Sequence, residues 1–244
     1  MIFKPYHADE TGCASYLLGC GGLGRCAVVD PHERFLDDYI AFAAAKGMRI
    51  THVLETHIHA DHRSAGRELA ARTGATYALH RSAPVSFPFE PLDDGQEIEL
   101  GNVRVRVVHT PGHTPESICL VVTDLRRGVD PWMVLTGDTL FVGAVGRADL
   151  PGQERDDAVL LHRSLHTRLL VLPDDVEVYP AHYAGSACGA GMSGKPSSTV
   201  GFEKRWNPML KLDPDAFAEA LGASPEKPEG MHGILALNRG HEAR

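Results

Sequence analysis

The stretch "ETHIHADHRSAG" at residues 55–66 carries His57, His59, Asp61 and His62 within six positions. Imidazole nitrogen and carboxylate oxygen are the ligands by which proteins hold zinc and non-haem iron. On an extended segment, His57 and His59 point the same way because side chains alternate along it. A histidine-rich surface loop would also have this composition, but it would not explain the segments that follow. We therefore expect this stretch to contribute to a metal site.

Three further segments each place a ligand-type side chain directly after an apolar run. "HTPGHTPES" contains His113, "LTGDTLF" contains Asp138, and "YPAHYAG" contains His182. Side chains delivered from strand ends at one edge of a sheet can converge on a site that a rigid scaffold supports. The four segments together predict one metal centre, and they leave open whether its reaction is hydrolysis.

The elements that must position these residues are short β-rich runs separated by helical patterns. Val103, Val105 and Val107 alternate with arginines, as expected of a strand with one solvated face. Asp61 and His62 fall at the start of a predicted helix. The order of elements favours two mixed sheets with helices outside. The predicted strands lie at 14–19, 26–30, 50–56, 75–79, 96–100, 103–110, 117–123, 132–138 and 176–182, and the predicted helices at 32–47, 61–74, 156–172 and 213–222.

Length and charge narrow the class of protein. At 244 residues the chain suits a single domain, 1–244, whose last ~45 residues are too few for a second domain and form an integral extension. Lys and Arg number 24 against 32 Asp and Glu, a net charge of −8, and no basic block occurs. This balance argues against nucleic acid as a partner.

The cysteines and the N-terminal residues indicate in which cellular compartment the protein is expected. The five cysteines are odd in number and form no CxxC pair, which argues against a disulfide framework and a zinc ribbon. The start "MIFKPYHADE" lacks the apolar core of a signal peptide, and no apolar run approaches the ~20 residues that span a membrane. We expect a cytoplasmic protein without a membrane partner.

The HxHxDH pattern at 57–62 and the three later segments, in this order, resemble the metallo-β-lactamase superfamily over residues ~11–190. This resemblance implies an α/β (α+β) fold, a four-layer αββα sandwich of two mixed sheets with the site along one edge. It also implies two metal positions that share Asp138. The first would be lined by His57, His59, His113 and Asp138, and the second by Asp61, His62, His182 and Asp138.

Within that superfamily, "CASYLLGC", "AVVDP", "GDTLFVGAVGRADL" and "GSACGAGMSGKPSSTVGFEKRWNP" look like the persulfide dioxygenase branch. This likeness implies one Fe(II) per chain, held by His57, His113 and Asp138. The substrates would be O₂ and glutathione persulfide or a similar low-molecular-weight persulfide, with sulfite and thiol as products. A rhodanese-type sulfurtransferase partner would be a separate protein, and the assembly, monomer or homodimer, stays open. In this branch His59, Asp61, His62 and His182 would support the ligands rather than bind a second ion.

Because all seven ligand-type residues are present, a glyoxalase II-like thioester hydrolase (hydroxyacylglutathione hydrolase) with one or two Zn(II) is the alternative enzyme. A third hypothesis, from another class, is a metal-binding sulfur carrier or sensor without turnover.

Four other residues are candidates for handling substrate. Arg147 could reach a substrate carboxylate or form a surface salt bridge, and Tyr183 could orient substrate or pack. Lys195 offers positive charge for an anionic thiol. Cys188, six positions after His182, is either a small buried residue or a sulfur relay near the metal.

Overall fold

The structure of the chain is a computed structural model that describes residues 1–148, 154–186, 191–222 and 230–241. Two six-stranded sheets make up its centre. The first has the strand order β1-β2-β3-β4-β5-β6, and the second has the order β12-β11-β10-β9-β8-β7. The first sheet consists of β1 (Ile2–Ala8), β2 (Cys13–Cys20), β3 (Arg25–Val29), β4 (Arg49–Leu54), β5 (Thr76–His80) and β6 (Glu90–Leu92). The second consists of β7 (Glu97–Leu100), β8 (Val103–His109), β9 (Ile118–Asp124), β10 (Met133–Gly137), β11 (Glu177–Pro180) and β12 (Ser198–Thr199).

Both sheets are mixed, as the sequence predicts. β1, β2 and β3 pair antiparallel, whereas β3 to β6 run parallel. In the second sheet only β10 and β11 pair in parallel. Because β9 is antiparallel to both β8 and β10, the strands β8, β10 and β11 share one direction and their C-terminal ends meet at one edge.

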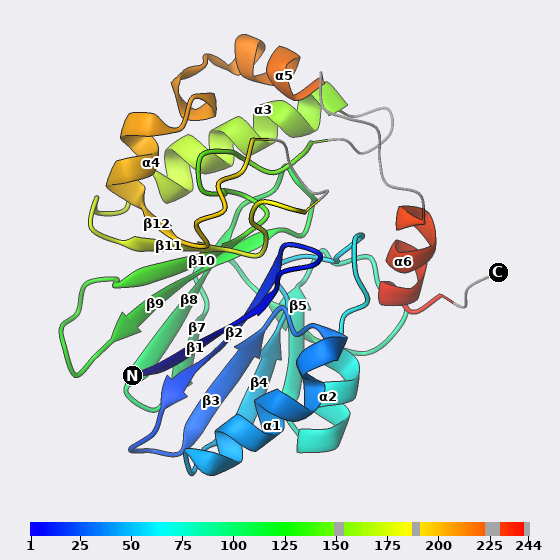
Figure 1. Ribbon diagram of the computed structural model, residues 1–244, viewed down its shortest axis with the longest axis vertical. Coiled ribbons are helices and arrows are strands. Elements are labelled where there is room, and N and C mark those ends of the chain that lie inside the picture. Colours follow the sequence, from blue (N-terminus) through cyan, green and yellow to red (C-terminus); the bar gives the residue numbers. More distant parts are fainter. Residues whose placement is uncertain (149–153, 187–190, 223–229, 242–244) are drawn as a thin grey trace.

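Helices cover the two outer faces (Figure 1). Helices α1 (Leu36–Ala45) and α2 (Gly66–Thr73) lie against the first sheet, and α3 (Glu154–Ser164), α4 (Val200–Trp206) and α5 (Pro214–Gly222) lie over the second. Helix α6 (Met231–Asn238) lies apart from both groups. The predicted four-layer αββα arrangement is confirmed. None of the helices in the described part of the chain is long and apolar enough to span a membrane.

The central core lies between the sheets. Val103, Val105 and Val107 of β8 are completely buried there, whereas the arginines between them are partly exposed, so the predicted alternation is confirmed. Separate apolar clusters join each sheet to its helices. The four cysteines among the described residues are buried free thiols.

One predicted helix begins later than its periodicity suggests. The pattern predicts a helix over 61–74, but α2 begins only at Gly66, and Asp61 and His62 lie in the preceding loop. The predicted C-terminal stop is confirmed, because Gly74 adopts the left-handed conformation (φ 68°) that favours glycine after a helix. The placement of Asp61 and His62 at a helix start is therefore wrong. Their orientation depends on the loop.

Candidate metal centre

The ligand-type residues follow the C-terminal ends of four strands. His57 follows β4, His113 lies in the loop after β8, Asp138 follows β10, and His182 follows β11. Gly137, at the end of β10, has φ 52°, and a Cβ there would lie 2.6 Å from Thr56 Oγ1. The close approach of β10 to the β4 loop therefore requires glycine, and this approach brings Asp138 next to His57.

His57, His113 and Asp138 form one compact group whose ligand atoms all lie within 4.8 Å of one another. Asp138 Oδ2 lies 3.8 Å from His57 Nε2 and 3.5 Å from His113 Nε2. His57 and Asp138 are buried, and His113 is partly exposed, so the group is reached from the side of His113. These are the three residues expected to hold one metal ion.

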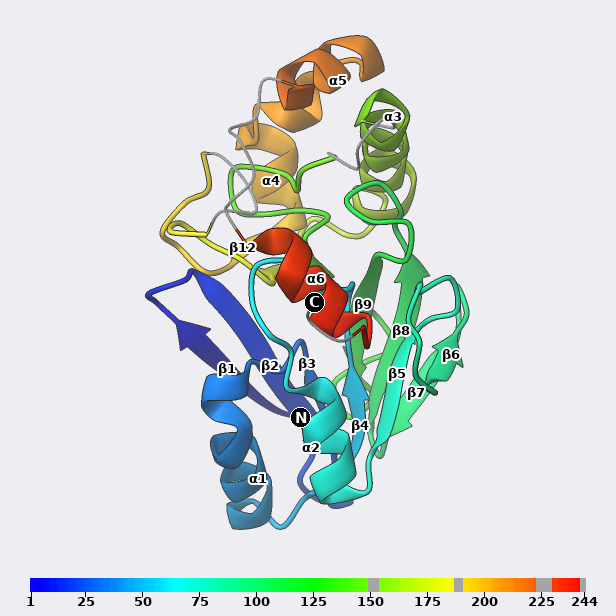
Figure 2. The ribbon, with the colours of Figure 1, turned by 90° about the vertical axis from the view of Figure 1, so that its right-hand side faces the viewer.

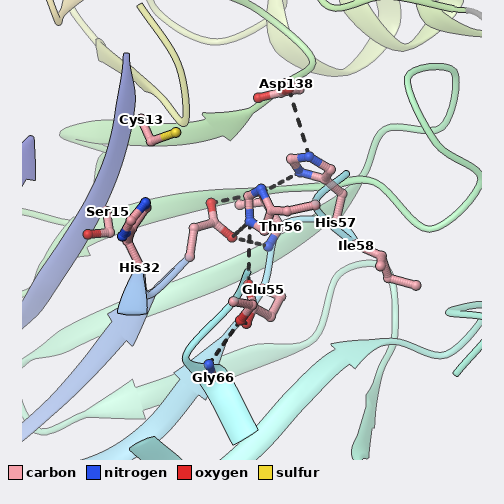
Figure 3. A network of polar contacts seen from close by, with 12 residues as sticks. Cys13, Ser15, His32, Glu55, Thr56, His57, Ile58, Gly66 and Asp138 are labelled. Atoms are coloured by element: carbon pink, nitrogen blue, oxygen red, sulfur yellow. Dashed lines mark hydrogen bonds and ion pairs between the residues drawn. The ribbon is translucent and has the colours of Figure 1, made fainter. Parts of the chain in front are cut away.

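The hydrogen bonds of the two histidines direct their Nε2 atoms at this group. His113 Nδ1 lies 2.9 Å from the backbone carbonyl oxygen of Arg147, which can only accept, so Nδ1 carries the proton. Thr56 donates its hydroxyl proton to Asp30 Oδ2 (2.8 Å), and its oxygen therefore accepts from His57 Nδ1 (3.0 Å). Figure 3 shows the His57 ring between Thr56 and Asp138. With the proton on Nδ1, Nε2 is the nitrogen of each ring that can offer a lone pair to a metal.

The electrostatics of the group suit a cation. Burial, and then the neighbouring His59, hold the pKa of His57 well below its ordinary value, so the ring is neutral. Burial alone would raise the pKa of Asp138, but the adjacent His182 holds it well below the ordinary range. Asp138 Oδ2 is buried and has no hydrogen-bond partner. Two ligand atoms that each lie ~2.1 Å from one ion are ~3.0–3.4 Å apart. The distances from Asp138 Oδ2 to the two Nε2 atoms would therefore need to shorten only slightly for an ion to bind.

His59 does not belong to this group. Its Nε2 lies 3.2 Å from Asp30 Oδ1 and 3.4 Å from Glu55 Oε2, and the three side chains form a separate buried cluster. Burial would lower the pKa of His59, but the two carboxylates raise it well above its ordinary value. The structure thus places His59 with supporting carboxylates rather than with His57, His113 and Asp138.

A second group lies beside the first and contains Asp61, His62 and His182 together with Cys13. His182 joins the two groups, since its Nδ1 lies 2.6 Å from Asp138 Oδ1 and its Nε2 lies 2.8 Å from Asp61 Oδ2. The Cys13 thiol donates to Asp61 Oδ2 (3.3 Å). Burial opposes ionisation of this thiol, but His182 and His62 outweigh it and lower its pKa to about 7.

The other candidates lie in different surroundings. Arg147 is buried, and its backbone carbonyl fixes His113. Tyr183 donates its hydroxyl to Asp9 Oδ1 (2.8 Å) and packs at the edge of the central core. Lys195 Nζ donates to the Ser197 carbonyl (2.7 Å). Their roles toward substrate stay predictions. Cys188 lies outside the described residues.

Sequence reasoning missed Cys13, Asp30, Glu55 and Thr56 as parts of the site. Asp30 ends the quoted run "AVVDP" and, apart from glycines, is the sole residue in the described part of the chain with positive φ (49°). Aspartate tolerates this conformation, which is often associated with function. The sequence signal for Asp30 was a carboxylate placed directly before a proline, where a turn is expected. The sequence gives no comparable signal for Cys13, which reaches the site only because β2 lies beside the His182 segment.

Comparison with known proteins agrees with this geometry. Residues 8–182, which include both groups, match the family described as the metallo-beta-lactamase superfamily. The chain belongs to the metallo-β-lactamase superfamily. Members of this superfamily bind divalent metals, and both groups lie within the matched residues.

Solved structures of superfamily members are similar along the whole chain. A metallo-beta-lactamase from Staphylococcus aureus has a TM-score of 0.92 at 33% identity, and the match covers 100% of this chain and 74% of that one. ETHE1 from Myxococcus xanthus has a TM-score of 0.85 at 29% identity, and the match covers 98% of both chains.

Relatives with different activities also match. The mitochondrial persulfide dioxygenase ETHE1 of Homo sapiens is 28% identical over 91% of this chain and 79% of its own length. A hydroxyacylglutathione hydrolase of Polaromonas is 34% identical over 69% of this chain and 61% of its own length. The family is thus shown, and its members that match this chain include both a dioxygenase and a hydrolase.

Proposed function

We propose that this protein is a non-haem Fe(II) persulfide dioxygenase. Its substrate is glutathione persulfide or a similar low-molecular-weight persulfide. One persulfide, one O₂ and one water give one thiol, one sulfite and two protons, so the atoms balance. The observation that carries the proposal is the group of two imidazoles and one carboxylate, from which His59 is turned away.

The residues fit one iron ion. Two histidines and one carboxylate on one face are the usual ligands of Fe(II) oxygenases, and they leave about three coordination positions open. When bound, Fe(II) would offer these positions to the persulfide sulfur and to O₂ and would carry electrons between them. The similarity to the human and Myxococcus xanthus ETHE1 proteins supports this proposal.

The chain's own side chains would position ligands and protons. The Arg147 carbonyl and Thr56 fix the two imidazoles, so their Nε2 atoms need no reorientation. His182 holds Asp138 by one oxygen and leaves the other directed at the histidines. With a carboxylate at each ring nitrogen, His182 can hold a proton next to the reacting atoms and exchange it during hydrolysis to sulfite.

The test compares two reactions of the same preparation. Anaerobically purified protein is mixed with glutathione persulfide, and O₂ uptake and sulfite are measured. In parallel it is mixed with S-lactoylglutathione, and thioester hydrolysis is followed. We expect O₂ uptake matched one to one by sulfite, and no thioester hydrolysis. Hydrolysis of S-lactoylglutathione without persulfide-dependent O₂ uptake would overturn the proposal.

The second group favours one alternative, a dinuclear zinc thioester hydrolase. Asp61, His62 and His182 lie beside the first group, and the Polaromonas hydroxyacylglutathione hydrolase is a relative. Asp61→Asn separates the two functions. A dinuclear hydrolase would lose its second ion and most of its turnover, whereas the dioxygenase would keep its single ion.

A further inference from the structure

The C-terminal helix α6 contacts the loop that carries the HxHxDH residues, and it does so through Asn238. Asn238 Nδ2 donates to the backbone carbonyls of His59 (2.8 Å) and His62 (2.9 Å). The backbone N–H of Ser64 donates to Asn238 Oδ1 (3.1 Å). One amide therefore bonds to three points of a six-residue stretch that is about 175 positions distant in sequence.

This loop needs such partners. Residues 59–64 belong to no helix or strand, so their peptide groups lack the regular partners that secondary structure supplies. Side chains from elsewhere in the chain bind the stretch just before them, where Asp30 accepts from the N–H of Thr56 (2.7 Å) and Glu116 from that of Ile58 (3.0 Å). Asn238 does the same for the second half of the loop. It lies outside residues 8–182, which match the superfamily.

The position of this loop affects Asp138, one of the expected metal ligands. It carries Asp61, whose Oδ2 lies 2.8 Å from His182 Nε2, and His182 in turn holds Asp138 Oδ1 at 2.6 Å. Movement of the loop would thus shift His182 and, through it, the carboxylate of Asp138 that belongs to the first group. Asn238 acts on Asp138 through two intervening side chains and touches no ligand atom itself.

Helix α6 is attached at a second point, away from the metal-binding loop. Ser86 donates its N–H to the Arg239 carbonyl (2.9 Å) and its hydroxyl to the Gly240 carbonyl (3.0 Å). Leu235 additionally packs against a small cluster that includes Leu79 and Ile58, and Ile58 lies within the HxHxDH stretch itself. Figure 2 shows α6 across the front of the molecule, above α2. The hydrogen bonds of Asn238 and those of Ser86 involve different residues and can therefore be tested separately.

We propose that α6 is a clamp on the metal-binding loop and that Asn238 is a positioning residue for the metal centre. The proposal rests on the proposed metal centre but not on its reaction. Asn238→Asp is the most specific test of these hydrogen bonds, because it replaces only the NH₂ group by oxygen. It keeps an acceptor for Ser64 but loses both donors to the His59 and His62 carbonyls. Asn238→Ala removes all three bonds. Ser86→Ala removes the hydroxyl bonds at the other attachment, keeps the backbone N–H bond, and is the control.

The experiment measures Co(II) binding to the metal-free full-length chain by chelator competition, with the visible absorption spectrum of the Co(II)-loaded protein as a second readout. We expect Asn238→Asp and Asn238→Ala to weaken binding about 10-fold or more and to change the spectrum, as loss of supporting groups does elsewhere. Ser86→Ala should stay within about twofold of wild type.

Wild-type affinity and spectrum in both Asn238 variants would overturn the clamp, even if their O₂ uptake were altered. An equal loss in Ser86→Ala would overturn the specific role of Asn238, because general docking of α6 would then suffice. Lack of Co(II) binding by the wild type would instead overturn the metal centre itself. Thermal unfolding of the metal-free variants shows that each is folded when its affinity is measured.

Discussion

Thr56→Val removes the hydroxyl that determines which nitrogen of His57 carries the proton. Valine has nearly the same shape, so the packing against Gly137 is kept. His57 Nδ1–H loses its acceptor, and Asp30 Oδ2 loses a donor. Both groups are buried, and each unsatisfied group costs about 1–3 kcal/mol. Asp30 keeps the N–H of residue 56 as a donor, so we expect a total loss of about 2–4 kcal/mol in the free energy of unfolding.

The larger effect should be on metal binding. Without an acceptor at Nδ1, the His57 proton can move to Nε2, where it blocks the lone pair. Loss of a group that orients a ligating histidine costs 10- to 100-fold in affinity, or about 1.4–2.7 kcal/mol. Chelator competition with Co(II) measures this change, and urea unfolding of the metal-free protein measures the stability. Thr56→Ser keeps the hydroxyl and is the control.

The expected order of affinity is wild type, then Thr56→Ser within a few-fold, then Thr56→Val at least 10-fold weaker. If Thr56→Val binds Co(II) within about twofold of Thr56→Ser, the proposed tautomer of His57 is refuted. A loss of stability without a loss of affinity would lead to the same conclusion.

Three further predictions follow from the geometry. His182→Gln should keep one bound ion but lower turnover about 10-fold or more, because Asp138 loses a supporting partner; loss of the ion would make His182 a ligand. Gly137→Ala should destabilise the protein by more than ~1 kcal/mol in urea unfolding, since the added Cβ meets Thr56 at a positive φ; unchanged stability would contradict this close approach. Burial, and then the neighbouring His109, lower the pKa of His80 to about 4. Between pH ~6.5 and 4 the unfolded chain therefore binds more protons at this residue than the folded chain does. The free energy of unfolding should fall as the pH drops through this range. His80→Gln should flatten that fall relative to wild type, and parallel curves would refute the assignment.

Much of the scaffold could be predicted from local pattern. Alternating valines predict β8, and ligand-type residues after β-rich runs predict the edge at which they meet. Strand β1 was missed because it contains Pro5, which is tolerated at the edge of a sheet but reads as an interruption. Helix α6 was missed because none of its residues is buried, so it shows little apolar periodicity.

The orientation of the site residues could not be predicted in the same way. An i, i+2 spacing predicts that His57 and His59 share a site, but Asp30 and Glu55 hold the second ring elsewhere. The apolar spacing of α2 can be extended back to residue 61, which is why the pattern predicts a longer helix. In the structure, however, Asn238 donates to the His59 and His62 carbonyls, and these residues stay in the loop. Both outcomes depend on tertiary contacts, which sequence spacing does not encode.

We propose that His57, His113 and Asp138 hold a single iron ion. The most direct test is quantitative iron and zinc analysis of anaerobically purified wild type beside His113→Ala. We predict about one iron and little zinc per chain in the wild type, and loss of the iron in the variant. Two zinc ions per chain in the wild type, or undiminished iron in His113→Ala, would contradict the claim.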